Sequence, residues 1–334
     1  MNSVNFINSI SEKKVLFVST KNSDYIRNVQ ELELLEKSAK HVTVIASPSK
    51  SYAKRLAYVY WQLSIALVKK NFDCLFIGFA PQLLFPFFLF FPKNKLVIID
   101  FFISFYDTLV DDRKKFKDGS IFSNLLKKLD TITIHKADLV LADTKAHKDF
   151  FASTFHYPEK NIDVVYIVAD TSIYTPLDRE KNDIFQVIYF GSILPVQGLD
   201  VILAAMKLLA TDDSIQFTII GPIDSKFDVK KENFPQTTFI PWLNQTELSS
   251  QINQSDLALA GHFSSTVGKA KRTIAGKTYI YKAMNKPVIL GDSPANHELF
   301  QPNEMNIYVE LGNPNELANA IKKQALEFYK HNNS

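Results

Sequence analysis

The sequence has little that could serve as a crosslink or as an export signal. Cys74 is the single cysteine among 334 residues, so an internal disulfide is excluded. A lone cysteine fits a reducing compartment. The first stretch, MNSVNFINSISEKK, has no long apolar run behind its charges, and no signal peptide is expected. We therefore expect a cytoplasmic protein.

The motifs of several enzyme classes are also missing. There is no G-x-G-x-x-G or G-x-x-x-x-G-K-[ST], which argues against NAD binding and against P-loop phosphoryl transfer. No C-x-x-C or H-E-x-x-H metal spacing occurs, and no G-x-S-x-G nucleophile elbow. The seven histidines are scattered. We therefore expect no metal and no other cofactor.

Residues 75–92 form a run of 18 residues without a charge, LFIGFAPQLLFPFFLFFP. This is close to the shortest length that spans a membrane, but Pro81, Pro86 and Pro92 interrupt it. The pattern favours a strand at 74–79, a turn and a short apolar helix. That helix is either buried in an α/β domain or presents a Phe/Leu face to the lipid interface. A membrane span is the third alternative.

Charge is nearly balanced over the whole chain but not along it. The formal net charge is +3. Residues 1–170 carry 23 Lys and Arg against 18 Asp and Glu, whereas the remainder carries 15 against 17. A mildly basic first half indicates an anionic membrane or a nucleic acid as partner. The cations are not interleaved with stacking aromatic residues, which argues against a nucleic acid.

Length and apolar pattern predict two doubly wound α/β domains. A chain this long exceeds one ordinary core, and short apolar runs alternate with amphipathic segments, as in βαβ units. The polar stretch at 175–183 indicates a linker, so the expected domains are 1–175 and 176–334. Strands are expected at 14–19, 41–46, 73–79, 95–100, 137–143, 161–167, 185–192, 216–222, 237–243, 256–262, 287–292 and 306–311. Helices are expected at 25–40, 57–70, 199–210, 246–254, 277–284 and at the end of the chain.

The stretch FGSILPVQGLD (190–200) leads from a strand into a helix. Gly191 and Gly198 permit a tight loop and the close approach of another molecule, and a helix N-terminus offers unpaired N–H groups. The alternative is an ordinary turn between a strand and a helix. In doubly wound sheets ligands lie off the carboxyl ends of the strands, so a substrate cleft is expected between the domains.

The stretch GKAKRTIAGK (268–277) holds four cations and no acidic residue: Lys269, Lys271, Arg272 and Lys277. They form either a solvated face or an anion site. The stretch continues through a helix and a strand to a loop that carries Glu298. Because such loops meet at one edge of a doubly wound sheet, we expect the cations to converge with the Gly191 loop on one anion, most simply a diphosphate. Glu298 would accept hydrogen bonds from sugar hydroxyls.

Taken together, these segments resemble the GT-B glycosyltransferases of the retaining family 4 type. The matching stretches are 187–209, FTIIGP (217–222), 237–259 and 277–300, and the first half matches more loosely through 97–115 and 137–151. The resemblance implies two Rossmann-like domains that face each other across a cleft. It also implies sugar transfer from a nucleotide-diphosphate sugar, with retention of anomeric configuration and without a bound metal. The implied acceptor is a saccharide, in cell-surface polysaccharide or glycoconjugate assembly.

The sequence departs from this family at its phosphate and ribose positions. Family members commonly carry Arg and Lys where this chain has Ser192 and Gln197. They also carry two Glu residues where it has Arg272 and Ile280, and the later Glu usually holds the ribose. We interpret Arg272 and Lys277 as a relocation of the positive charge that grips the diphosphate.

The implied catalytic residues are Arg272 and Lys277 on the leaving diphosphate, with Asp100 in the first domain. Asp100 would orient the acceptor hydroxyl or act as base; its alternative role is a helix-cap or turn residue. Donor-binding residues are expected to be Gly191, Ser192, Gln197, Gly198, Gly221, Trp242, Lys271 and Glu298, although Trp242 is equally a packing residue. Acceptor-binding residues are expected to be Arg27, Gln82 and Asp107.

A basic cluster in the first half, DDRKKFKDG (111–119), follows the apolar segment 82–91. Together they indicate docking to an anionic membrane and a polyprenyl-diphosphate-linked acceptor. We therefore expect a peripheral location on the inner face of the cell membrane.

Three other functions compete with the enzyme. A catalytically silent GT-B subunit that stabilises an active partner would explain Gln197 and Ile280. A nucleic-acid-binding protein would use the basic first half. A sugar-nucleotide epimerase of the same fold would need an acid/base His and Glu constellation that the sequence lacks.

Overall fold

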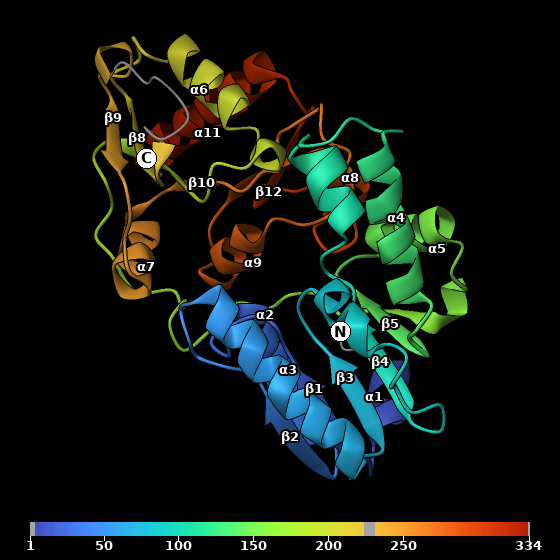
Figure 1. Cartoon of the computed structure of the whole chain (residues 1–334). Coiled ribbons are helices and arrows are strands. Elements are labelled where there is room, and N and C mark those ends of the chain that lie inside the picture. The colour runs from blue at the N-terminus through green and yellow to red at the C-terminus, as the bar shows by residue number, and fades with distance from the viewer. Residues whose placement is uncertain (1–3, 224–230, 333–334) are drawn as a thin grey trace. The chain divides into compact units, whose positions relative to one another are not determined.

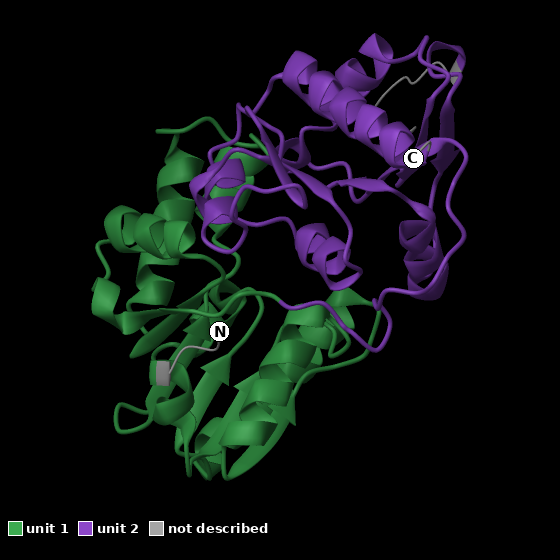
Figure 2. Cartoon of the chain, turned by 180° about the vertical axis from the view of Figure 1, so that it is seen from behind, with its two compact units in different colours: residues 1–167 green, residues 168–334 purple. Residues whose placement is uncertain are grey.

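The computed structural model describes residues 4–223 and 231–332. The chain divides into two compact units, residues 1–167 and 168–334, which Figure 2 shows in green and purple. The boundary predicted after residue 175 lies a few residues further along the chain. Each unit contains its own parallel β-sheet with helices on both faces (Figure 1).

Unit 1 is built on a six-stranded sheet in the order β2-β1-β3-β4-β5-β6, with all neighbouring strands parallel. Short runs of Val, Ile, Leu and Phe form these strands, as expected for strands that are buried on both faces. The strands are β1 (Lys14–Val18), β2 (His41–Ile45), β3 (Cys74–Ile77), β4 (Leu96–Asp100), β5 (Leu139–Ala142) and β6 (Ile162–Val164). All six lie at their predicted positions.

Successive side chains of these strands point to opposite faces of the sheet and enter two separate cores. Phe17 and Phe76 pack with the helices on one face, and Leu16 and Leu75 pack with those on the other. The first face is covered by α1 (Val4–Ile10) and α2 (Ile26–Ser38). The second is covered by α3 (Tyr52–Lys69), α4 (Ile121–Ile134) and α5 (Lys145–Phe155), together with the short helix η1 (Pro81–Phe87). The short helices η2 (Asp107–Asp112) and η3 (Glu159–Asn161) complete the unit.

The apolar segment after β3 forms the short 3₁₀ helix η1, which confirms the predicted short apolar helix. Leu84 and Phe88 are buried, whereas Leu89 is 87 % exposed and Phe90 is 67 % exposed. The segment therefore covers the core with one side and presents apolar side chains on the other. No helix within residues 4–223 or 231–332 is long and apolar enough to cross a membrane.

Unit 2 contains a second parallel sheet in the order β12-β11-β10-β7-β8-β9. Its strands are β7 (Phe185–Phe190), β8 (Ile215–Ile220), β9 (Thr237–Ile240), β10 (Leu257–Leu259), β11 (Val288–Gly291) and β12 (Asn306–Val309). These too lie at the predicted positions. The strand order reverses between β7 and β10, so the loops that follow these two strands lead to opposite faces of the sheet. Such a switch point at the carboxyl edge is where doubly wound sheets bind ligands.

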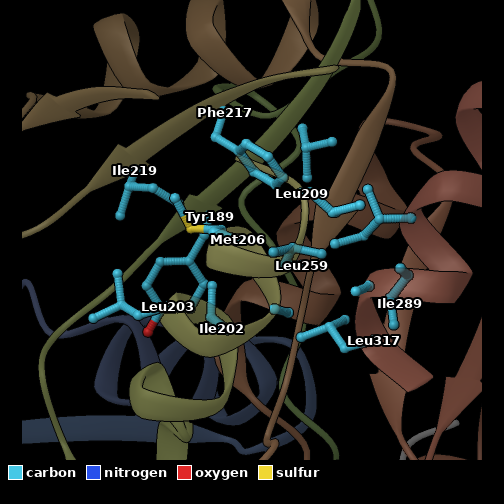
Figure 3. Close-up of a cluster of buried hydrophobic side chains, with 14 of the residues drawn as sticks. Tyr189, Ile202, Leu203, Met206, Leu209, Phe217, Ile219, Leu259, Ile289 and Leu317 are labelled. Carbon is cyan, nitrogen blue, oxygen red and sulfur yellow. The ribbon is translucent and has the colours of Figure 1, made fainter. Parts of the chain in front are cut away.

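The helices of unit 2 also lie on both faces. On one face α6 (Leu199–Leu208) and α11 (Pro314–Asn332) pack side by side, and their apolar residues enclose Tyr189 and Phe217 of the sheet (Figure 3). On the other face α7 (Gln245–Gln254) and α9 (Gly276–Ala283) cover β7, β10 and β11. Short helices complete the loops: η4 (Pro195–Gln197), η6 (Lys231–Asn233), α8 (Lys269–Arg272) and α10 (Pro294–His297).

The core of unit 1 offers a direct test of this architecture. Phe76 is fully buried and its ring packs against the rings of Phe6 and Phe17. We expect Phe76→Ala to lower the free energy of unfolding by about 3–5 kcal/mol because it leaves a cavity. Phe122→Ala, at a 60 % exposed ring, should change it by less than about 0.5 kcal/mol. Urea unfolding followed by circular dichroism measures both values, and equal values would contradict the assigned core.

Candidate functional site

The loop that follows β7 lies in contact with the end of β8. Gly191 donates its N–H to the carbonyl of Ile220, and a Cβ on Gly221 would overlap the carbonyl oxygen of Gly191. Gly221 has a φ of +152°, which side-chain-bearing residues rarely adopt. Both glycines are therefore required by backbone geometry, and they bring two predicted donor-binding positions together.

The end of the same loop contacts the segment that follows β10. A Cβ on Gly198 would lie 2.6 Å from both the carbonyl carbon of Phe263 and the amide nitrogen of Ser264. The carbonyl of Gln197 accepts a hydrogen bond from Phe263 N–H at 3.2 Å. The loops after β7 and β10 thus meet at the switch point of the sheet, and Gly198 begins α6 there.

Lys277 reaches this meeting point from the first turn of α9. Its Nζ lies 2.7 Å from Oε1 of Gln197 and 3.8 Å from the centre of the Tyr189 ring. A Cβ on Gly191 would lie 2.9 Å from the same Nζ. The side chain is 5 % exposed, and burial lowers its pKa well below the usual range for lysine. Within the described residues no carboxylate pairs with it.

Helix α9 is held in place by a second contact with β7. The hydroxyl of Tyr281, one turn after Lys277, accepts a hydrogen bond from the N–H of Phe190 at 3.2 Å. The ring of Tyr281 packs edge-on against Phe190 at 5.2 Å. Since Tyr281 lies in the core of one face and Tyr189 in that of the other, Lys277 extends across the strand ends. Ile280 packs against the core beside Tyr281.

The other predicted cations lie on α8. This helix packs against η4 and α10, so it borders the Gly191 loop. Arg272 is half-buried and Lys271 is exposed. Lys277 contacts the Gly191 loop through the hydrogen bond from its Nζ to Oε1 of Gln197. A role for Arg272 and Lys271 on the diphosphate stays a prediction.

The other residues predicted to bind the donor lie after the ends of neighbouring strands. Glu298 is the half-buried residue that ends α10, after β11. Trp242 follows β9 and is 74 % exposed, so it is not a packing residue of the unit 2 core. Ser192 is exposed next to Gly191. Contact of these three side chains with a donor stays a prediction.

In unit 1, two of the predicted residues form a buried ion pair. Nε and Nη2 of Arg27 donate to the two carboxylate oxygens of Asp100 at 3.1 and 3.0 Å, and both side chains are 1 % exposed. Nη1 of Arg27 donates to the carbonyl of Val165. Glu31, one turn along α2, lies 3.4 Å from Nε of Arg27. Burial and the nearby Asp100 carboxylate raise the pKa of Glu31 well above its usual range.

Asp107 belongs to a second buried cluster, which the sequence did not indicate. Nδ1 of His147 lies 2.6 Å from Oδ1 of Asp143, and its Nε2 lies 3.6 Å from Oδ2 of Asp107. Burial alone lowers the pKa of His147, but the two carboxylates outweigh it and raise the pKa. One feature of the sequence could have revealed the contact between Asp143 and His147. Their four-residue spacing places them one helical turn apart at the start of α5.

Gln82 braces a turn. Its Nε2 donates to Oδ1 of Asp130 at 2.7 Å and to the carbonyl of Ile103 at 2.8 Å. Asp130 also accepts from Ser104 Oγ and from the N–H groups of Phe105 and Tyr106. Burial outweighs these bonds and raises the pKa of Asp130 to about 6. Arg27, Gln82, Asp100 and Asp107 therefore make internal contacts, and their direct contact with an acceptor stays a prediction.

No cluster that could hold a metal occurs among residues 4–223 and 231–332: no three His, Cys, Asp or Glu side chains are grouped suitably. In each sheet, a buried cationic side chain lies near the edge formed by the carboxyl ends of the strands. Among the described residues of unit 2, the Lys277 amine has no carboxylate partner. In unit 1, the carboxylates are already paired with Arg27 and His147.

Comparison with known proteins places this geometry in a class. Residues 184–325, most of unit 2, match the family described as glycosyl transferases group 1. No curated protein sequence matches the chain significantly.

Solved structures match the chain over both units. Sucrose-phosphate synthase from Thermosynechococcus elongatus superposes with a TM-score of 0.69 at 12 % identity, covering 95 % of this chain and 90 % of that chain. Anabaena HepE in complex with UDP-glucose gives 0.64 at 14 %, with 96 % and 91 % covered. The lipopolysaccharide outer core galactosyltransferase WaaB gives 0.57 at 13 %, with 94 % and 90 % covered. At these identities the likeness shows the fold alone.

The two sheets, their switch points and these matches define a protein with the GT-B fold, as the resemblance implied. Its second unit matches the glycosyl transferases group 1 family over residues 184–325.

The carboxylate network of unit 1 predicts a pH effect on stability. Glu31 has a raised pKa in the folded protein, so it favours folding below its unfolded pKa of about 4.3, and this contribution is lost as the pH rises through the folded value. We expect Glu31→Gln to unfold at a higher urea concentration than the wild type in alkaline buffer, and the difference to shrink in acidic buffer. If the difference in urea midpoint between Glu31→Gln and the wild type grows as the pH falls, the raised pKa of Glu31 is contradicted.

Proposed function

We propose that this protein transfers a sugar from a nucleotide-diphosphate sugar to a saccharide acceptor, with retention of anomeric configuration and without a bound metal. The observation that supports the proposal is Lys277, a buried ammonium at the switch point of unit 2 whose contacts are a carboxamide oxygen and an aromatic ring. Burying a charge without an opposite charge is costly. A diphosphate would supply the missing negative charge.

The proposed reaction uses this charge on the leaving group. The bond between the anomeric carbon and the phosphate oxygen breaks, and its electron pair stays on the diphosphate. Lys277 stabilises the charge that develops there, in a site from which water is largely excluded. Arg272 on α8 and the N–H groups at the start of α6 assist it. The acceptor hydroxyl forms the new bond to carbon, and its proton passes to a diphosphate oxygen.

The remaining residues bind the two substrates in this proposal. Glu298 accepts hydrogen bonds from donor-sugar hydroxyls, and Trp242 and Gly221 flank the nucleoside. Asp100, held by Arg27, shapes the carboxyl edge of unit 1 where the acceptor binds. The solved HepE structures are described as complexes with UDP and with UDP-glucose, which is consistent with a nucleotide-sugar donor here.

We further propose that unit 1 docks on an anionic membrane, where it meets a lipid-linked acceptor used in polysaccharide or glycoconjugate assembly. Leu89 and Phe90 are exposed next to η1, and η1 packs against α4, on which Ile121 and Phe122 are also exposed. The ring of Phe122 stacks on Phe116 at 5.4 Å. Exposed apolar side chains of α4 therefore lie beside the basic cluster of residues 111–119. Such a combination binds anionic lipid surfaces.

Lys277 is the residue whose removal tests the transfer reaction. We expect Lys277→Met to lower the rate of sugar transfer by about 100- to 1,000-fold, because it removes a preorganised cation from the leaving group. It should also abolish the thermal shift that a nucleoside diphosphate causes. The assay screens UDP-, GDP- and TDP-sugars for release of the nucleoside diphosphate.

Lys282→Met is the matched control, since Lys282 lies on the same helix and its Nζ donates to the carbonyl of Met305 instead. It should retain transfer. If the wild-type protein neither binds nor turns over any nucleotide sugar, the silent-subunit alternative replaces this proposal.

Flotation with liposomes tests the membrane surface. We expect the triple variant Arg113/Lys114/Lys115→Glu to bind anionic liposomes about 100-fold more weakly, since each basic residue near the surface contributes about 1 kcal/mol. The control Lys322/Lys323/Lys330→Glu reverses three exposed charges on α11 of unit 2 and should bind as the wild type does. Equal flotation of the first variant and the wild type would exclude this surface.

A further inference from the structure

The ammonium of Lys277 has an unusual neighbourhood for a buried cation. Buried lysines are normally paired with a carboxylate, yet here Gln197 provides a carboxamide oxygen and Tyr189 provides the face of its ring. Both are neutral groups that attract a cation without neutralising it. The seat formed by Gln197 and Tyr189 therefore fixes the amine and leaves it without a negative partner, so that a ligand can supply one.

Gln197 is itself held rigidly. Its N–H donates to the carbonyl of Leu194 at 3.0 Å, and its own carbonyl accepts from the N–H of Phe263 at 3.2 Å. The residue ends η4, directly before the left-handed Gly198 that starts α6. The carboxamide is thus carried by backbone anchored to both loops at the switch point, so its position relative to the site is fixed.

Tyr189 is fixed equally well. It is 1 % exposed within the core of Figure 3, packed among the apolar residues of α6 and the sheet. Its hydroxyl has no hydrogen-bond partner in the part of the chain that the structure describes, and a Cβ on Gly191 would lie 3.4 Å from it. The bare Cα of Gly191 therefore faces both this hydroxyl and the ammonium of Lys277.

The surrounding titratable groups supply no negative charge. On β7 and α9, burial raises the pKa of Tyr189 and of Tyr281, so both phenols remain neutral. The short helix α8 contributes only the cations Lys269, Lys271 and Arg272, and β11 carries no titratable residue. β7, α8, α9 and β11 therefore place no carboxylate beside the seat. Asp200, in the first turn of α6, is exposed.

From these contacts we infer that Gln197 and Tyr189 are positioning residues, which hold the Lys277 ammonium over Gly191 in a neutral seat so that it can grip the diphosphate of the donor. The inference rests on the proposed function for the identity of the anion. It assigns to Gln197 a role through Lys277, in place of the direct donor contact expected from the sequence. A neutral side chain at this position is then a requirement, because a carboxylate would neutralise the ammonium.

Replacing Gln197 by Glu tests the neutral seat with almost no change in shape. The protein is labelled with ¹³C-lysine, and NMR without nucleotide follows the Cε signal of Lys277 as the pH changes. This signal is the one that is missing from the spectrum of Lys277→Met, and its pH dependence gives the titration midpoint. We expect Gln197→Glu to raise this midpoint, because a carboxylate favours the charged amine. We expect Gln197→Met to lower it, because a hydrogen bond to the charged form is lost.

Nucleotide binding provides the second readout. We expect Gln197→Met to weaken binding of the tightest of UDP, GDP and TDP by about 10-fold, the effect of losing a hydrogen bond to a charged group. Gln197→Glu should weaken it further, since it adds negative charge beside the phosphates. The matched control is Gln251→Glu on α7, which lies near Gln186 and Val187 in β7 and should change neither the midpoint nor the affinity.

The outcomes separate the inference from the proposed function. If Lys277→Met binds the nucleotide as the wild type does, or if no diphosphate binds the wild type, the proposed anion site is wrong. If Lys277→Met loses binding while both Gln197 variants keep the wild-type midpoint and affinity, the positioning role is wrong and the proposed function stands. A raised midpoint in Gln197→Glu with weakened nucleotide binding supports both.

Discussion

The proposed chemistry depends on one interaction, the contact of the buried Lys277 side chain with two neutral groups at the switch point of unit 2. Removing an ammonium from water is costly, and the cost is usually offset by a carboxylate. In this protein the carboxamide of Gln197 and the ring of Tyr189 take that place. A buried cation in this state is prepared for an anionic ligand, which in the proposed function is the diphosphate of a sugar donor.

The two units differ in whether their buried cations are paired with carboxylates. In unit 1, Arg27 and His147 each contact two carboxylates, so the charges of that carboxyl edge are largely satisfied within the protein. In unit 2, the cation at the carboxyl edge lacks such a partner in the described residues. Both sheets are parallel and doubly wound, so the fold alone does not decide this difference. The side chains placed on the loops decide it.

The strands could be predicted from the sequence because fully buried parallel strands consist of short apolar runs. Helix α4 was not among the predicted helices, and its apolar side chains include the exposed Ile121, Phe122 and Leu125. The approach of Lys277 to the Gly191 loop could be predicted, because both follow strands whose carboxyl ends meet. The direction of Lys277 depends on Tyr189 and Gln197, which are distant in the chain, and the pairing of Asp100 depends on Arg27 in an earlier helix. No local pattern encodes such contacts.

Proton linkage on nucleotide binding tests the central claim most directly. Calorimetric titration of the tightest-binding nucleoside diphosphate, at about pH 8.5 in two buffers of different ionisation enthalpy, counts the protons taken up. Lys277 has a lowered pKa without ligand, and a bound diphosphate favours its charged form. The account predicts net proton uptake by the wild-type protein and none by Lys277→Met. Binding without proton uptake over the alkaline range, or equal uptake by the variant, would contradict it.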